Sequence, residues 1–203
     1  DYSLLYETIS PRVQALVQKT FNDFQKKGLV YQALKPALYC WQCQTSVAQA
    51  EVEDKNLPGV FYNLKFKQAD NSPLIIATTR PELLPAIVAV FVHPDDKRYQ
   101  KMIGTEVETP LGEKVKVFEE VEVDPQKGSG AVMICSYGDE TDLRLIEKHH
   151  LPEKIIFDER GKFLDHYRAG LKGKTIPEAR ELIVSWLDAH GFISNEERII
   201  HAV

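Results

Sequence analysis

The apolar residues between positions 29 and 118 come in short runs, and this pattern restricts the fold more than any other feature of the sequence. β-Branched and aromatic side chains are frequent in these runs, and turn-forming residues separate them at Lys35-Pro36, Pro58-Gly59, 71–73 and 110–112. Short runs of this composition, bounded by proline and glycine, are typical of β-strands. This part of the chain therefore predicts a β-rich body.

Individual runs indicate where the strands lie. Apolar and polar residues alternate over 62–66, which is the pattern of a strand with one face in water. The runs 74–77 and 87–92 are apolar on both sides, so we expect both to be central strands. A further strand is expected at 131–135.

Three helices are predicted from capping signals and periodicity. Apolar residues recur at helical spacing between Pro11 and Gly28. A second helix begins near Asp139, where acidic residues come first and basic residues last. A third begins with a capping box at Thr175 and stops at Gly191. Because the helices are isolated and no βαβ alternation occurs, the predicted class is α+β around a closed or curved sheet.

The composition narrows the class of protein further. With 43% apolar and 27% charged residues, the 203-residue chain can bury the core of one large or two small domains. No apolar run approaches the roughly 18–20 residues that cross a bilayer, and no leader pattern is present, so no membrane contact is expected. A net charge of −5 means that charge alone will not hold a nucleic acid, so any RNA contact must be local.

The cysteine count and the chain ends suggest where the protein works. Three cysteines argue against a disulfide framework and for a reducing compartment, so we expect a cytoplasmic protein. The chain starts at Asp1 without a methionine and ends in a strand-like run, 198–203. These ends predict a piece of a longer polypeptide.

One cysteine pair has the spacing of a metal site. Cys40 and Cys43 form a CxxC, which can supply two of the four ligands of a structural zinc. Cys135 is distant in sequence and is typical of a small core residue. We therefore expect half of a zinc knuckle, whose second pair of ligands lies outside this chain.

A cluster of polar residues, Thr78-Thr79-Arg80-Pro81-Glu82, directly follows the apolar run 74–77. It places two hydroxyls, a guanidinium and a carboxylate at the end of a strand, where sites commonly form. Its alternative interpretation is a polar strand end with a proline stop. The turn Gly128-Ser129-Gly130 is too short for a phosphate loop.

Two carboxylates, Asp139 and Asp142, stand at the expected start of the second helix. In a structural interpretation Asp139 caps the helix. In a functional interpretation the two carboxylates face one opening, where they bind an ammonium group or position a water. No histidine, serine or cysteine has the spacing of a nucleophilic triad, so water is the expected nucleophile of a hydrolase.

The order of these pieces resembles the editing insertion of class I aminoacyl-tRNA synthetases for branched aliphatic amino acids, most closely the valyl-specific members. The blocks 78–82 and 128–132 and the pair Asp139 and Asp142 carry the resemblance, which runs nearly end to end. The segments 91–94 and 133–135 are similar to archaeal-type members.

The resemblance implies an organisation for the chain. It predicts a single editing domain over 1–203, with a β-barrel-like core and peripheral helices. Residues 1–55 would hold the N-terminal helix and the CxxC connection, and 56–203 the β-rich core with helices. The zinc knuckle would be completed by the parent enzyme, so we expect no metal site in the isolated chain and no cofactor for editing.

The resemblance also implies a reaction, the hydrolysis of threonine esterified to tRNA(Val), with threonyl adenylate as a second substrate. Asp142 would bind the α-ammonium group, and Asp139 the threonine hydroxyl or the attacking water. Thr78 and Thr79 would contact water or the developing oxyanion, and Arg80 the loop or the terminal nucleotide. The residues expected to be catalytic are Asp142, Asp139 and Thr79. The expected substrate-binding residues are Thr78, Thr79, Arg80, Glu82, Met133, Asp139 and Asp142.

The expected partners are the 3′ end of tRNA(Val) carrying threonine and the rest of the synthetase in cis, and the isolated domain is expected to be a monomer. One position departs from the pattern. Common bacterial members carry a lysine, and isoleucyl members a histidine, where this chain has Met133. Two alternatives stay open: an isoleucyl-type editor that removes valine from tRNA(Ile), and a non-catalytic insertion that only positions tRNA.

Overall fold

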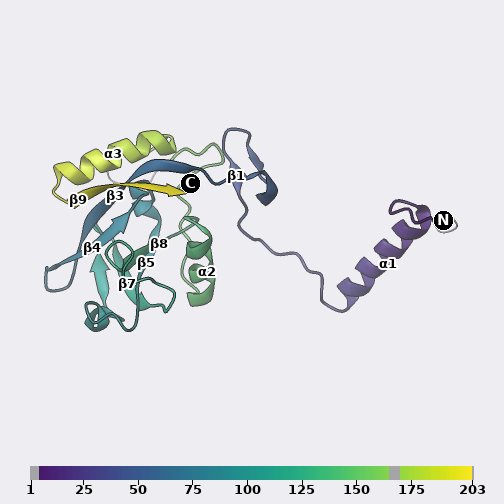
Figure 1. The fold of residues 1–203 in the computed structure, drawn as a ribbon, viewed down its shortest axis with the longest axis horizontal. Coiled ribbons are helices and arrows are strands. Elements are labelled where there is room, and N and C mark those ends of the chain that lie inside the picture. The colour runs from purple at the N-terminus through teal and green to yellow at the C-terminus, as the bar shows by residue number, and fades with distance from the viewer. Residues whose placement is uncertain (1–4, 165–169, 203) are drawn as a thin grey trace. The chain divides into compact units, whose positions relative to one another are not determined.

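The computed structural model describes residues 5–164 and 170–202. The chain divides into two units, Asp1–Pro36 and Ala37–Val203. The first unit contains the helix α1 (Pro11–Lys26), which begins at the predicted proline (Figure 1). Its apolar side chains, among them Phe21 and Phe24, are exposed within the described residues. The CxxC lies in the second unit, and the predicted division at residue 55 remains a prediction.

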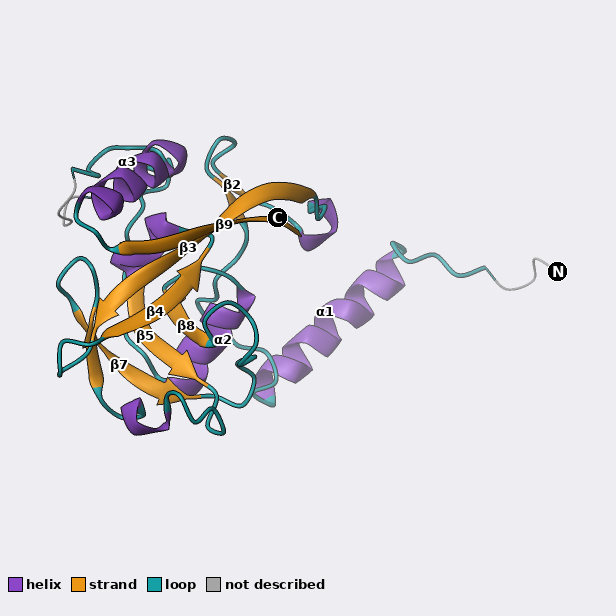
Figure 2. Cartoon of the chain, turned by 60° about the vertical axis from the view of Figure 1, so that its left-hand side comes forward, coloured by secondary structure: helices purple, strands orange, loops and turns teal. Residues whose placement is uncertain are grey.

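The second unit is built on a curved seven-stranded sheet (Figure 2). The strand order is β4-β3-β6-β7-β5-β8, and β9 also pairs with β3. The two ends of this path, β4 and β8, contact each other, so the sheet curls toward a barrel. The strands are β3 (Asn56–Lys67), β4 (Pro73–Thr78), β5 (Ile87–Val92), β6 (Glu106–Glu108), β7 (Lys114–Glu119), β8 (Ala131–Cys135) and β9 (Ile193–Ala202).

Helices lie outside the sheet, which confirms the predicted α+β class with a curved sheet. The two longer helices of this unit, α2 (Glu140–His149) and α3 (Ile176–Ala189), begin and end where capping signals predicted. Short 3-10 helices are η1 (Gln49–Glu51), η2 (Pro81–Ala86) and η3 (Gln100–Met102). A separate hairpin joins β1 (Tyr39–Cys40) to β2 (Thr45–Ser46). No helix in the described residues is long and apolar enough to span a membrane.

The two apolar runs that were expected to be central strands have different positions. All of β5 is buried, and it lies between β7 and β8 as predicted. The prediction was wrong for 74–77, because β4 stands at one end of the strand path and, within the described chain, pairs with β3 alone. The loop that contains Gly128 lies against the half-buried face of β4, since a Cβ on Gly128 would lie 2.9 Å from the Cβ of Ala77.

The core has two parts, and each holds one helix against the sheet. Ala179, Ile183 and Leu187 of α3 are fully buried in the larger cluster. Leu145 and Ile146 of α2 belong to the smaller cluster, with residues of β5 and β8. Burying one such leucine or isoleucine contributes roughly 1.5–3 kcal/mol. The start of α2 is thereby fixed beside the end of β8.

Candidate active site

A pocket of about 690 Å³ opens between the ends of β4 and β8 and the start of α2. Its size lies within the range of about 300–1,000 Å³ that is usual for small-molecule sites. Among the residues that line it are all but one of those expected to bind substrate: Thr78, Thr79, Arg80, Met133, Asp139 and Asp142. The remaining lining residues are Phe61, Ala77, Leu83, Lys127, Val132, Ile134, Cys135, Gly138, Thr141, Ile199 and Ile200.

Two carboxylates are fixed at the start of α2 by a reciprocal capping box. Asp142 donates its backbone N–H to Oδ1 of Asp139 over 2.9 Å, and Asp139 donates its N–H to Oδ2 of Asp142 over 3.0 Å. The backbone N–H of Cys135 also donates to Oδ1 of Asp142, over 3.3 Å. The helix cap expected from the sequence is therefore present. Because each carboxylate oxygen can accept more than one hydrogen bond, capping leaves both residues able to bind a ligand.

The environment of Asp142 changes its acidity. Burial, and after it the negative charge of Asp139, raises the pKa of Asp142 to about 7. The hydrogen bonds from Cys135 and Asp139 and the charge of Arg80 act in the opposite direction. A raised pKa in a pocket is typical of functional carboxyl groups, although structural clusters also produce it.

The end of β4 presents two hydroxyls with different surroundings. The buried Thr78 accepts the backbone N–H of Arg80 at its Oγ1, over 3.1 Å, so this hydroxyl holds the turn. Within the described residues the hydroxyl of Thr79 has no hydrogen-bond partner, and it lines the pocket. Thr79 can therefore bind a ligand or a water without breaking a contact of the fold.

Two charged residues, Arg80 at the pocket wall and Glu82 behind it, complete the block 78–82. Arg80 donates from Nη1 to the carbonyl of Gly138 over 2.7 Å, which joins the end of β4 to the start of α2. Glu82 does not line the pocket, because its carboxylate is fully buried and pairs with Arg180 over 2.6 Å. The structure thus brings together the expected substrate-binding residues, but places Glu82 behind them.

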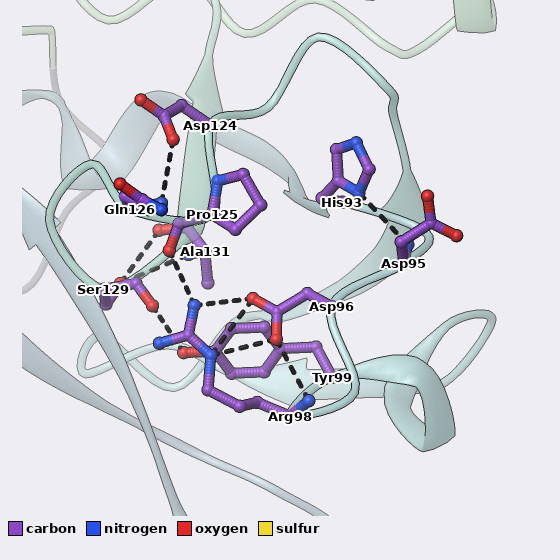
Figure 3. A network of polar contacts seen from close by, with 10 residues as sticks. All are labelled: His93, Asp95, Asp96, Arg98, Tyr99, Asp124, Pro125, Gln126, Ser129 and Ala131. Carbon is purple, nitrogen blue, oxygen red and sulfur yellow. Dashed lines mark hydrogen bonds and ion pairs between the residues drawn. The ribbon is translucent and has the colours of Figure 1, made fainter.

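The loop 124–130 borders the pocket and is held by the network in Figure 3. Arg98 forms an ion pair with Asp96 over 2.6 Å and donates from Nη2 to the carbonyl of Pro125 over 2.7 Å. The hydroxyl of Tyr99 donates to the carbonyl of Ser129 over 2.7 Å. Gly130, with φ +79°, leaves no room for a side chain, because a Cβ would lie 2.4 Å from the Arg98 guanidinium.

Comparison with known protein families identifies the chain. The family model described as "tRNA synthetases class I (I, L, M and V)" matches residues 1–188. The chain belongs to the class I tRNA synthetases. A valine–tRNA ligase from Pyrococcus furiosus is 44% identical over 207 residues, which are 100% of this chain and 23% of that protein. A valine–tRNA ligase from Rickettsia prowazekii is 41% identical over 204 residues, which are 100% of this chain and 25% of that protein.

These matches confirm the predicted resemblance to valyl-specific synthetases, and the chain spans about a quarter of the length of these relatives. A solved ternary complex of LeuRS from Agrobacterium radiobacter K84 with tRNA and LeuAMS matches with a TM-score of 0.52 and 17% identity. The match covers 96% of this chain and 33% of that one. At this identity the likeness shows the fold alone.

Several residues of this synthetase pocket were not expected from the sequence. Lys127 lines it and forms no ion pair with any described residue. Its place directly before the turn Gly128-Ser129-Gly130 was the signal that could have indicated it. Phe61 comes from β3, and Ile199 and Ile200 come from β9. These strands are far apart in sequence, and no local pattern predicts that they pair.

The CxxC lies in the β1–β2 hairpin. The backbone N–H of Cys43 approaches the Sγ of Cys40 at 3.4 Å, and this hydrogen bond lowers the pKa of the Cys40 thiol. The contact between the two side chains raises the pKa of the Cys43 thiol, so the acidity of the pair does not by itself indicate a metal site. Among the described residues no group of three or more histidine, cysteine, aspartate or glutamate side chains lies together in a way that could hold a metal ion.

Proposed function

We propose that this region is the editing module of a valyl-tRNA synthetase and hydrolyses the ester that joins threonine to tRNA(Val). The observation that carries this proposal is the half-buried carboxylate of Asp142, which lines one pocket together with the free hydroxyl of Thr79. An anionic anchor for the α-ammonium group and a hydroxyl near the ester are what such a hydrolase requires. The valine–tRNA ligase relatives support the choice of tRNA.

Asp142 is proposed to bind the α-ammonium group of the amino acid. This role requires the ionised carboxylate, and a pKa of about 7 leaves a large fraction ionised at neutral pH. The arriving ammonium charge favours ionisation further, since an opposite charge within a few ångströms lowers the pKa of an acid. The ion pair would fix the ester carbonyl relative to the other groups of the pocket.

The hydrolytic step is proposed to use water as the nucleophile. Asp139 is at the pocket wall and can orient that water or accept the hydroxyl of threonine. The hydroxyl of Thr79 can donate to the oxyanion that develops when water attacks the ester carbon. The bond between that carbon and the ribose oxygen then breaks, which releases threonine and leaves the hydroxyl on the tRNA. Thr78 supports this site through its bond to the backbone of Arg80.

Selectivity would follow from the difference between threonine and valine. The two amino acids are nearly isosteric, so an apolar synthetic pocket rejects threonine weakly, and a second site must recognise the hydroxyl. Asp139 is exposed in the free chain, so the bound aminoacyl group would have to cover its carboxylate; valine would then remove water from this group without replacing the hydrogen bond, at a cost of roughly 1–3 kcal/mol. This penalty would protect correctly charged tRNA.

Met133 is the feature that favours the alternative of a non-catalytic insertion. Only 8% of its surface is exposed at the pocket wall, so it offers apolar volume where some relatives offer a polar group. The pocket nevertheless keeps Asp142 and a free Thr79, which favours hydrolysis. An isoleucyl-type activity on tRNA(Ile) is less favoured, because valine–tRNA ligases match the whole chain.

Three further parts of the proposal concern the parent enzyme. We infer that the rest of the synthetase acts in cis by delivering the tRNA 3′ end to the pocket, and that threonyl adenylate is a second substrate. We also infer that the parent completes a zinc site at Cys40 and Cys43, as a structural rather than a catalytic metal.

The test is hydrolysis of threonyl-tRNA(Val) and valyl-tRNA(Val) by this chain and by a synthetase that contains it. Each is compared with Asp142→Ala and with Glu147→Ala, an exposed change on the same helix. We expect loss of the threonyl ester only, abolished by Asp142→Ala and unaffected by Glu147→Ala. Survival of both esters with the full-length enzyme would favour the non-catalytic alternative. Valyl-tRNA(Ile) is assayed beside them, and its hydrolysis would favour the isoleucyl type.

A further inference from the structure

A fully buried carboxylate, that of Glu82, lies behind the pocket without lining it. It belongs to η2, in which every residue is buried. A buried carboxylate is costly unless opposite charges and hydrogen bonds compensate it. The partners of Glu82 therefore decide how the neighbouring pocket is held.

The first partner is Arg180, on α3. Its Nη2 lies 2.6 Å from Oε1 of Glu82, and its Nε lies 2.9 Å from Oε2. This is the two-pronged geometry in which a guanidinium binds a carboxylate most strongly, and the pairing raises the pKa of Arg180. The neighbouring Ala179 and Ile183 are in the same core cluster as Leu83, so the position of Arg180 is fixed.

The second partner is Arg80, on the pocket side. Its Nε lies 3.4 Å from the same Oε1 of Glu82, which is a long contact. Its shorter bond, of 2.7 Å, goes from Nη1 to the carbonyl of Gly138. Gly138 precedes the capping residue Asp139, and it has no space for a side chain because Asp142 Oδ2 fills it. Arg80 thus connects Glu82 to the start of α2.

We propose, on the basis of the proposed function, that Arg180 is a positioning residue for the editing pocket. It compensates the charge of Glu82 from the side of α3, and this leaves Arg80 to hold the carbonyl of Gly138. Arg180 does not line the pocket, so it acts through Arg80 and not on the substrate.

The physical reason is that Glu82 and the carbonyl of Gly138 compete for the guanidinium of Arg80. Without Arg180, Arg80 would be the nearest cation to a fully buried carboxylate. The attraction between charges is strong where water is excluded, so Arg80 would turn toward Glu82 and release Gly138. The first turn of α2, with Asp139 and Asp142, would lose its connection to β4.

The test compares Arg180→Gln with Arg144→Gln, a control on α2 whose half-exposed side chain pairs with Glu122. We expect Arg180→Gln to lower kcat/KM for threonyl-tRNA(Val) about ten- to a hundredfold, because small displacements of catalytic groups have effects of this size. Arg144→Gln should have the same kcat/KM as the wild type. Equal rates for Arg180→Gln and the wild type would overturn the inference while leaving the proposed function intact.

Two combined variants separate positioning from general destabilisation. In Arg80→Gln/Glu82→Gln, where position 82 carries no charge, adding Arg180→Gln should cause little further loss of rate, because the bond from Arg80 to Gly138 is already absent. Adding Glu82→Gln to Arg180→Gln should restore most of the lost rate, because no buried charge then attracts Arg80. The inference would be overturned if the losses of rate multiplied in the first comparison. It would also be overturned if Glu82→Gln did not restore the rate of Arg180→Gln in the second.

Hydrogen exchange gives a readout that does not depend on activity. The N–H groups of Asp139 and Asp142 are bonded in the capping box, and we expect both to exchange faster in Arg180→Gln but not in Arg144→Gln. If the wild-type synthetase hydrolyses neither ester, the proposed function fails, and hydrogen exchange alone then tests whether Arg180 positions the first turn of α2. Unchanged exchange at these two amides would then reject positioning by Arg180.

Discussion

Asp139 and Asp142 each accept the backbone N–H of the other at the first turn of α2, over 2.9 and 3.0 Å. The bonds that cap the helix therefore also hold two negative charges at one wall of the pocket. Because like charges disfavour each other's ionised form, the cap and the acidity of Asp142 are linked. The same arrangement of Asp139 and Asp142 therefore serves the helix cap and places both carboxylates where a ligand could bind.

The first prediction concerns the pH dependence of editing. In the proposed role Asp142 must be ionised to bind an ammonium group, and its pKa is raised to about 7, so kcat/KM should rise with pH through this midpoint. At higher pH it should fall again, because the α-ammonium group of the substrate, with an ordinary pKa of about 8, loses its proton. Asp139→Asn removes a charge that raises this pKa, so the midpoint should move to lower pH even if the maximal rate falls. The measurement is threonyl ester hydrolysis from about pH 5.5 to 8.5, corrected for the uncatalysed rate.

Glu147→Gln, a change on the exposed part of the same helix, serves as the control and should leave the midpoint unchanged. A flat profile in the wild type would contradict the assigned role of Asp142. So would a midpoint that moves to higher pH in Asp139→Asn.

The second prediction concerns stability. The pKa of Asp142 is about 7 in the folded chain and about 4 in an unfolded one, so the folded state binds more protons between these values. Its contribution to stability is therefore present at low pH and is lost as pH rises toward 7. Asp142→Asn does not titrate, so the free energy of unfolding of the wild type minus that of the variant should fall by roughly 1–3 kcal/mol between pH 4 and 8.

Urea unfolding of both proteins at the two pH values measures this difference. The comparison cancels the opposite contributions of carboxyls such as Asp96, whose pKa is lowered by its hydrogen bond from Arg98. Parallel stability curves for the wild type and the variant would show that burial does not raise the pKa of Asp142.

Local signals allowed much of the fold to be predicted. The helix starts at Pro11, Asp139 and Thr175 follow from capping, which depends on residues within one turn. The run 87–92 is also a local signal. Because all of its residues are apolar, its composition alone indicated a strand buried on both faces. For 74–77 the same composition misled, because apolar side chains on both faces report what covers the faces, here the core and the loop at Gly128, and not whether a strand pairs at each edge.

The site was predictable only where its residues stand in recognisable blocks. Thr78–Arg80 and the carboxylate pair have such blocks, and the structure brings them together in one pocket. Glu82 was expected to face the substrate, but its burial depends on Arg180, which is 98 residues away. Strand β9 reaches the pocket by pairing with β3, which is far away in sequence, and no local pattern encodes that pairing.

The third prediction uses the lack of space at Gly138. A Cβ there would lie 1.8 Å from Oδ2 of Asp142, so Gly138→Ala must displace that carboxylate from the capping box. We expect at least a tenfold loss of threonyl ester hydrolysis, since the anchor for the ammonium group moves. Loss of the cap should lower the free energy of unfolding by about 0.5–2 kcal/mol. Kinetics and urea unfolding measure the two effects.

Glu140→Ala is a suitable control, because this residue is in the same turn but does not line the pocket. Wild-type hydrolysis by Gly138→Ala would mean that the position of Asp142 is not important for the reaction. A loss of activity without any loss of stability would show that the carboxylate matters to the substrate more than to the helix.

The fourth prediction concerns Lys127, which lines the pocket and forms no ion pair with the described residues. Its loop is fixed by the bond from Arg98 to Pro125, so its ammonium group projects from a rigid support. The proposed substrate, an aminoacylated tRNA, is a polyanion and the chain has a net charge of −5, so a local cation at the pocket should contribute to binding. Lys127→Gln should raise the KM for threonyl-tRNA(Val) and leave kcat nearly unchanged.

The dependence on salt distinguishes a phosphate contact from other effects. Each phosphate contact to a single strand contributes about 0.7 to the slope of log affinity against log salt concentration, so Lys127→Gln should reduce that slope by about 0.7. Lys114→Gln, an exposed change on β7 away from the pocket, should not alter it. An unchanged slope with a raised KM would assign Lys127 to the shape of the pocket, and an unchanged KM would remove it from substrate binding.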